Sequence, residues 1–158
     1  MLNLHVNSNA ILKASGSGLR LLNVKSFDKQ GLPACQSKAE SLMQLGVGVP
    51  VSTMIEQNYI SDVFEGPGLV IDASTVFMEV NQVKKCDAGG MLVQSSQAQY
   101  QAEDELEYLY NFSVVQADMM TLHFNGLYGL LVQDFFGFIQ LKKSNIHDNE
   151  GYGVQMLN

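Results

Sequence analysis

Basic residues are scarce in this sequence. Only nine of the 158 residues are Lys or Arg, against sixteen Asp or Glu, and the formal net charge is −7. Arg20 is the single arginine, and two lysine pairs, 84–85 and 142–143, stand far apart. A nucleic-acid surface needs clustered positive charge to neutralise phosphates. We therefore expect no DNA or RNA partner.

Long apolar runs are also lacking. No run approaches the roughly 18 to 20 residues that would cross a bilayer, and the opening MLNLHVNSNAILK has neither a basic leader nor an apolar signal core. We therefore expect a cytoplasmic chain without membrane contact. With 46% hydrophobic residues and three prolines, the chain has the composition of one globular domain.

Cysteine is nearly absent. Cys35 and Cys86 form no CxxC pair and no Cys/His ligand spacing. Two cysteines cannot build a disulfide framework, and this spacing does not suit a metal cluster. We predict no metal and no cofactor.

A glycine repeat runs along the chain. Apolar residues follow a glycine one and three places later at Gly18, Gly68, Gly90, Gly129 and Gly153, which is the alternation of a short strand. These apolar pairs are Leu19/Leu21, Leu69/Ile71, Met91/Val93, Leu130/Val132 and Val154/Met156. A degenerate sixth copy begins at Gly46.

Two further apolar features precede these glycines. Seven residues before them stand Ile11, Val83, Leu122 and Ile146, with Ile60 displaced by one. Twelve and fourteen residues before them stand Leu4/Val6, Val76/Met78, Val115/Ala117 and Ile139/Leu141, with Thr53/Ile55 in the displaced copy. Each repeat therefore holds two or three short strands.

The repeat length predicts an all-β, right-handed parallel β-helix of about six coils over residues 1–158. Equivalent inward side chains would stack at about 4.8 Å, the spacing of neighbouring strands. Leucine-rich repeats are the main rival, but the LxxLxLxxN signature and helical periodicity are both missing. We expect the two ends, near Leu4 and Met156, to be uncapped. The chain should then either associate or form part of a longer solenoid.

A corner position lies four residues before each glycine. Its occupants are Ala14, Phe64, Cys86, Asn125 and Asn149. Asn125 and Asn149 fall in successive coils, so we predict a structural asparagine ladder, in preference to a catalytic role. Cys86 is expected to be a buried thiol that behaves as a small hydrophobe, not a reactive one.

Two insertions interrupt the repeat, at about 23–45 and 94–114. The first is either a distorted coil or a long loop. The second is rich in acids and tyrosines, and two interpretations stay open: partner docking, or a solvated excursion with one short helical turn. The partner-binding candidates are Tyr100, Glu103, Asp104, Glu105, Glu107, Tyr108 and Tyr110.

Catalytic clusters are not evident. The offsets of the acids near the coils scatter and do not recur from coil to coil; these acids are Asp62, Asp72, Glu79, Asp87, Asp134, Asp148 and Glu150. The positions of His123 and His147 predict that their side chains form a column on the solvent side. The GxSxG and phosphate-loop motifs are missing from the sequence. We predict a chain without catalytic residues. The aromatics could form a sugar-stacking stripe or, as we expect, pack within and between coils; they are Tyr128, Phe135, Phe136, Phe138 and Tyr152.

The segment NIHDNEGYGVQML at 145–157 resembles the short repeats of eukaryotic right-handed β-helix proteins, including some F-box adaptors. With the acidic insertion and residues 112–137, the chain looks more like the Shc-binding, Nessun Dorma-type family. That resemblance implies a non-enzymatic scaffold that associates with centralspindlin at the spindle midzone or midbody. It transfers no functional residue to a numbered position. The alternative is a carbohydrate-active or carbohydrate-binding β-helix module.

Overall fold

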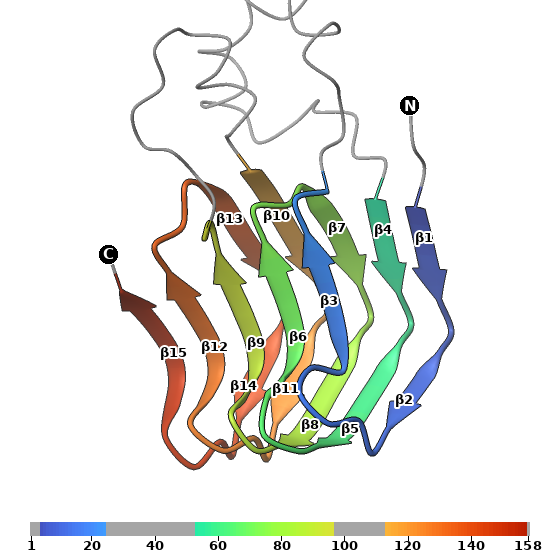
Figure 1. Ribbon diagram of the computed structural model, residues 1–158, viewed down its shortest axis with the longest axis vertical. Helices are drawn as coiled ribbons and strands as arrows, with labels where there is room; N and C mark the ends of the chain where they lie inside the picture. Colours follow the sequence, from blue (N-terminus) through green and yellow to red (C-terminus); the bar gives the residue numbers. More distant parts are fainter. Residues whose placement is uncertain (1–3, 25–52, 97–112, 158) are drawn as a thin grey trace, which may run out of the picture.

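The computed structural model describes residues 4–24, 53–96 and 113–157, and these residues form a right-handed parallel β-helix (Figure 1). Fifteen short strands succeed one another along the described chain. Every third strand belongs to the same sheet, so three parallel five-stranded sheets enclose the core. Three consecutive strands make one coil, and the described residues contain five coils.

The first sheet contains β1 (Leu4–Asn7), β4 (Thr53–Glu56), β7 (Val76–Glu79), β10 (Ser113–Asp118) and β13 (Gly137–Lys142). The second contains β2 (Ala10–Leu12), β5 (Tyr59–Val63), β8 (Gln82–Cys86), β11 (Thr121–His123) and β14 (Asn145–His147). The third contains β3 (Leu19–Leu22), β6 (Pro67–Asp72), β9 (Gly89–Gln94), β12 (Tyr128–Gln133) and β15 (Tyr152–Leu157).

The strand register confirms the predicted columns. In the second sheet Ile11 pairs with Ile60, Ile60 with Val83, and Leu122 with both Val83 and Ile146. In the third sheet Leu69 pairs with Leu19 and with Met91. Along each strand, inward residues alternate with outward residues. The inward side chains of all coils therefore meet in one core.

The first and second coils are direct neighbours, because β1 pairs with β4, β2 with β5 and β3 with β6. The predicted sixth copy at Gly46 lies outside the described residues. One corner assignment is wrong: Val63, not Phe64, pairs with Cys86, and Phe64 is about half exposed. The second coil has one extra residue at this corner, and the same shift displaced Ile60 in the sequence pattern.

The repeat glycines are needed because neighbouring coils approach closely. A Cβ atom on Gly90 would collide with the backbone oxygen of Gly129 and with the Asn125 amide. A Cβ atom on Gly129 would collide in the same way with the Gly153 oxygen and the Asn149 amide. The reason is space and not a left-handed backbone, since neither glycine has a positive φ.

We call the turn after each first-sheet strand the first corner and the turn after each second-sheet strand the second corner. Both corners use non-glycine residues in the left-handed region. At the corner after the first-sheet strand these are Ser8, Gln57, Val80, Met119 and Lys143, with φ between 47° and 55°. Each costs roughly 1–2 kcal/mol of backbone energy. Hydrogen bonds between coils offset that cost, such as Gln57 N donating to Glu79 O at 2.9 Å.

Candidate functional site

Asparagines stack at two corners of the solenoid. At the second corner Asn125 Nδ2 donates to Asn149 Oδ1 at 3.0 Å, and the Cys86 N–H donates to Asn125 Oδ1 at 3.2 Å. The two asparagines expected to form a ladder are therefore hydrogen-bonded to each other. Their amides also reach the carbonyls of Val83 and Leu122 in the preceding coils.

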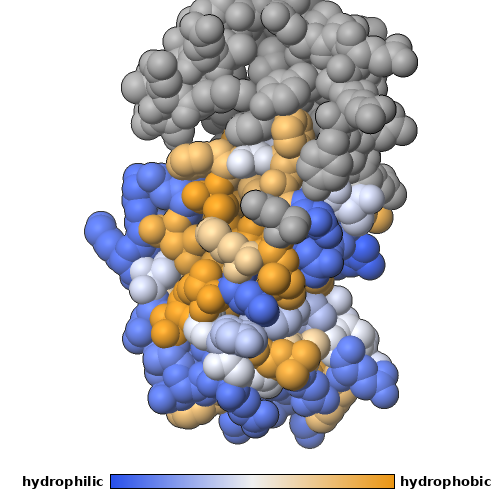
Figure 2. All heavy atoms as spheres, turned by 90° about the vertical axis from the view of Figure 1, so that its left-hand side faces the viewer, coloured by the Kyte–Doolittle hydropathy of each residue, from blue (hydrophilic) through white to orange (hydrophobic). Residues whose placement is uncertain are grey.

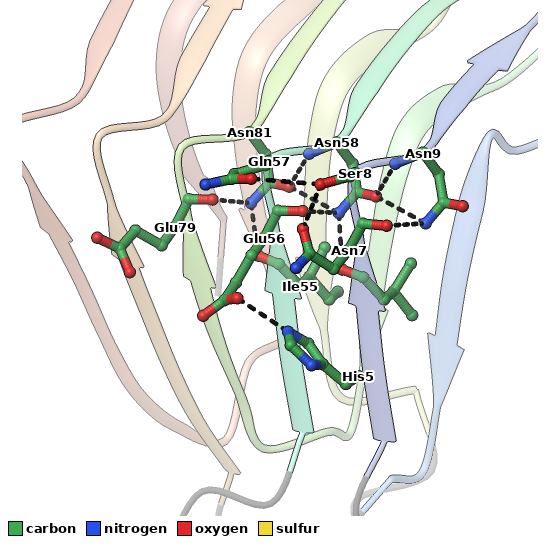
Figure 3. Close-up of polar contacts among 11 residues, drawn as sticks. His5, Asn7, Ser8, Asn9, Ile55, Glu56, Gln57, Asn58, Glu79 and Asn81 are labelled. Atoms are coloured by element: carbon green, nitrogen blue, oxygen red, sulfur yellow. Dashed lines mark hydrogen bonds and ion pairs between the residues drawn. The ribbon is translucent and has the colours of Figure 1, made fainter.

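A second ladder, which the sequence reasoning missed, occupies the first corner and consists of Asn9, Asn58 and Asn81 (Figure 3). Asn58 Nδ2 donates to Asn81 Oδ1 at 3.0 Å and to Val6 O at 2.9 Å. Asn58 and Asn81 are each only 2% exposed. The signal was present in the sequence, because each of the three asparagines lies two residues before the inward aliphatic of the second-sheet strand. Both ladders are structural, since their polar atoms are used between coils.

The third corner of the solenoid, between a third-sheet strand and the next first-sheet strand, is where both insertions join the coils. The chain leaves the first coil after Val24 and returns at Thr53, and it leaves the third coil after Ser96 and returns at Ser113. The two exits are two coils apart, a separation of about 10 Å at the ordinary strand spacing. The seven docking candidates, from Tyr100 to Tyr110, lie outside the described residues.

Asp72 anchors the exit of the second insertion. Its carboxylate is fully buried and accepts hydrogen bonds from the Ser96 N–H at 2.9 Å, from Ser96 Oγ at 2.6 Å and from Gln94 Nε2 at 2.9 Å. Arg20 of the first coil lies 3.4 Å away. Burial acts to raise the pKa of Asp72, but the bonds from Ser96, Gln94 and Arg20 together hold it below its ordinary value. Asp72 thus ties three coils together beside Ser96.

Carboxylates recur from coil to coil on the outer face of the first sheet, and only one of them, Glu79, is among the seven acids whose offsets scatter. Glu56 pairs with Glu79, and Glu79 pairs with Asp118. This acidic row continues into Asn7 in the first coil and Lys142 in the fifth. Glu79 and Asp118 both stand eleven residues before their repeat glycines, and Glu56 stands twelve before Gly68, but Glu56 and Asp118 were not among the acids considered from the sequence.

The acidic row borders a shallow hollow of about 60 Å³. Asp118 and Lys142 line it together with Phe77, Gln116 and Gln140. Asp118 Oδ1 is buried and has no hydrogen-bond partner within the described part of the chain. At the other end of the row, His5 Nε2 lies 2.8 Å from Glu56 Oε2. The hollow therefore combines a carboxylate, an ammonium group, amides and one aromatic ring.

His123 and His147 stack on the outer face of the second sheet, with ring centroids 5.1 Å apart. The predicted column exists, but His123 is buried at 9% exposure. Its Nε2 lies 2.8 Å from Gln82 Nε2. Burial, followed by the neighbouring His147 and Lys84, lowers the pKa of His123. These contacts do not pair a general base with a nucleophilic side chain.

Cys86 is 1% exposed in the core, and burial raises the pKa of its thiol to about 11. A thiol of that pKa is protonated at neutral pH and is a poor nucleophile. Cys35 lies outside the described residues. Over the described ranges, the His, Cys, Asp and Glu side chains form no group of three suited to a metal ion.

The five aromatics do not form one stripe. Tyr128 and Tyr152 are neighbours in the third sheet, with Tyr128 buried and Tyr152 exposed. Phe135 packs against the core at the third corner, and Phe138 belongs to the first sheet. A continuous sugar-stacking surface is therefore not present among them.

The fold defines the class of protein as a right-handed parallel β-helix with outward-facing polar rows. The search of family models, of curated proteins and of solved structures finds no match to this chain. In the segments that the structure describes, no helix has the length and apolarity required to cross a membrane.

Proposed function

We propose that this chain is a protein-interaction scaffold whose solenoid carries both insertions at the same corner. The observation that carries the proposal is that both insertions join the coils at the same corner, two coils apart. Loops held on a rigid framework are common recognition elements. The stacked coils supply that framework.

The composition of the second insertion favours a basic partner. Residues 97–112 contain four acids and no basic residue, together with Tyr100, Tyr108 and Tyr110. Tyrosine supplies amphipathic contact area at interfaces, and the acids would complement a positive surface on the partner. The Asp72 network beside Ser96 supports this role, because it fixes the point from which the insertion leaves the coil.

Centralspindlin is the first partner to test, because the resemblance in the sequence implies it. Binding of purified centralspindlin to the whole chain would be measured by interferometry. The test variant replaces residues 98–110 with a short Gly-Ser linker and keeps Ser96, so that the hydrogen bonds to Asp72 remain. We expect the variant to lose binding while its melting temperature stays unchanged.

A charge-matched pair of variants sharpens this experiment. One neutralises Glu103, Asp104, Glu105 and Glu107, and the other neutralises Glu65, Asp87, Asp148 and Glu150 near the second corner. Only the first should weaken binding. Equal binding by the deletion variant, or equal loss in both neutralised variants, would contradict docking through the insertion.

Carbohydrate binding or hydrolysis is the second candidate, and the acidic row favours it. Glu79 and Asp118 lie on neighbouring strands, which are spaced about 4.8 Å apart. Retaining glycosidases hold their two carboxyl groups about 5–5.5 Å apart. Phe77 and Gln116, which line the adjoining hollow, add a stacking ring and an amide.

The carbohydrate candidate is tested on a panel of polysaccharides, with binding and release of reducing ends as separate readouts. Glu79→Gln should abolish either activity, and Glu150→Gln, at an exposed position beyond the row, should not. If the unchanged chain neither binds nor cleaves any member of the panel, the acidic row has a structural role only.

A further inference from the structure

The outer end of the fifth coil is an open, apolar surface. Figure 2 shows apolar side chains gathered at the centre of this end, with hydrophilic side chains on both sides of them. They surround a hollow of about 380 Å³ lined by Ile139, Leu141, Ile146, Val154 and Met156, among others. Val154 and Met156 are 51% and 65% exposed, although they continue columns that are buried in the third coil.

Gly153 is the most specific feature of this end. In each of the four preceding coils, a Cβ atom on the repeat glycine would collide with atoms of the next coil. A Cβ atom on Gly153 would meet only Ile146 Cγ2, at 4.0 Å, which is ordinary contact. Gly153 also has no positive φ. The described coils therefore give no packing reason for a glycine here, whereas a further coil stacked on the fifth would.

The first coil of a second copy has the dimensions to occupy that place. Its inward residues Leu4, Ile11 and Leu19 are seven and then eight residues apart, and so are Ile139, Ile146 and Val154 in the fifth coil. The second coil is longer by one residue at the second corner. The two end coils thus match in perimeter, and all their strands would continue the parallel sheets.

The asparagine ladder of the first corner also points to a preceding coil. Asn58 and Asn81 each donate from Nδ2 to a carbonyl of the coil before, to Val6 O and Ile55 O respectively. Asn9 holds the same position, but its Nδ2 reaches only Asn7 O and Asn58 Oδ1. In a head-to-tail stack the acceptor for Asn9 would be Leu141 O, which occupies the position equivalent to Val6 O.

Charge is complementary across the same junction. At the left-handed position of the second corner, the first three coils carry Lys13, Asp62 and Lys85, which alternate in sign, and the fourth carries the uncharged Phe124. Asp148 holds this position in the fifth coil. Stacking would place Lys13 of the second copy over Asp148, which carries the opposite charge.

We propose that this chain associates head to tail, with the first coil of one copy stacked on the fifth coil of the next. Such an interface joins two different surfaces and leaves both outer ends available, so association continues into a filament. This inference does not depend on the proposed interaction or carbohydrate function.

The test blocks one end at a time in the whole chain and follows size by sedimentation velocity over a dilution series. Gly153→Val obstructs the fifth coil, because the added side chain would meet the Gly18 region of the incoming copy. Ala10→Pro obstructs the first coil. Its N–H corresponds to the Tyr59, Gln82, Thr121 and Asn145 N–H groups that donate to the preceding coil. Leu127→Lys, at an exposed apolar site of the fourth coil, is the control.

We expect the unchanged chain and Leu127→Lys to form a concentration-dependent series of oligomers. Each end-blocked variant alone should be monomeric, and a mixture of the two should stop at a one-to-one dimer, because each supplies the end that the other has lost. Thermal melts establish that both variants are folded, and Met156→Lys replaces Gly153→Val if that variant is not.

Two results would overturn the proposal. One is an unchanged chain that stays monomeric throughout the series, which would mean that something other than a second copy covers these ends. The other is a dimer formed by Ala10→Pro alone, which would show that two fifth coils pack against each other.

Discussion

The third and fifth coils have the same sequence pattern but very different burial. Val76, Met78 and Val83 of the third coil are completely buried, and their counterparts Ile139, Leu141 and Ile146 are only partly buried. Both coils place these side chains inward. The difference arises because the third coil has a neighbour on each side, whereas the fifth has one among the described coils. In a solenoid, an inward position is buried only when both adjacent coils are present.

The largest expected effect is a charge in the middle of a column. Leu122→Asp should lower the free energy of unfolding by about 4 kcal/mol or more, because Leu122 is fully buried between Val83 and Ile146. Ile146→Asp should cost about half as much, since Ile146 borders the open end. Chemical denaturation at concentrations at which the chain is monomeric measures both, and equal losses would contradict the difference between inner and end coils.

A central ladder amide should matter more than a terminal one. Asn58→Ala removes bonds to Asn9, Val6 and Asn81 and should cost about 3 kcal/mol, because buried partners are left unpaired. Asn149→Ala should cost about 1 kcal/mol, since Asn149 contacts a ladder neighbour on one side only. Urea midpoints compare the two variants. If the ladder hydrogen bonds do not contribute to stability, the urea midpoints of both variants would lie close to that of the unchanged chain.

Asp72 should link stability to pH. Its folded pKa lies below the ordinary value of 3.8, so the unfolded state binds the proton more tightly. The stabilisation is therefore present above pH 3.8 and is lost as the pH falls through that value to the folded pKa. Asp72→Asn should cost about 2 kcal/mol at neutral pH.

Urea titrations of the unchanged chain and Asp72→Asn at neutral and acidic pH measure this link. The difference between the two proteins should shrink as the pH falls. A difference that stays the same in acid would show that the carboxylate charge is not what stabilises the third corner.

The smallest expected effect is a gain. Val80 is a β-branched residue at φ 53° and is about half exposed. Val80→Asn should stabilise the fold by about 0.5–1 kcal/mol, because asparagine tolerates the left-handed region better than valine. Leu12→Asn, at an exposed strand position without a positive φ, should bring no gain. Melting temperatures would register the difference.

Pattern alone was enough to predict the architecture. The fixed distances between repeat glycines and aliphatic residues gave the columns that the strand register confirms, as in Ile60 beside Val83. It was also enough to place Asn125 and Asn149 in successive coils. Where a coil gained one residue, the same counting failed: Phe64 was assigned to the position that Val63 occupies.

Strand periodicity and repeat length were enough to predict which residues face inward, because both are local properties of the chain. Tertiary structure decided which outward residues become neighbours, since register across coils depends on the length of every corner between them. Only the folded chain brings Glu56, Glu79 and Asp118 into one row, joins Asp72 to Ser96 and Arg20, and leaves Gly153 facing open space. The contacts of the acidic row and of Asp72 join residues 22 to 52 positions apart, so they depend on how the coils stack.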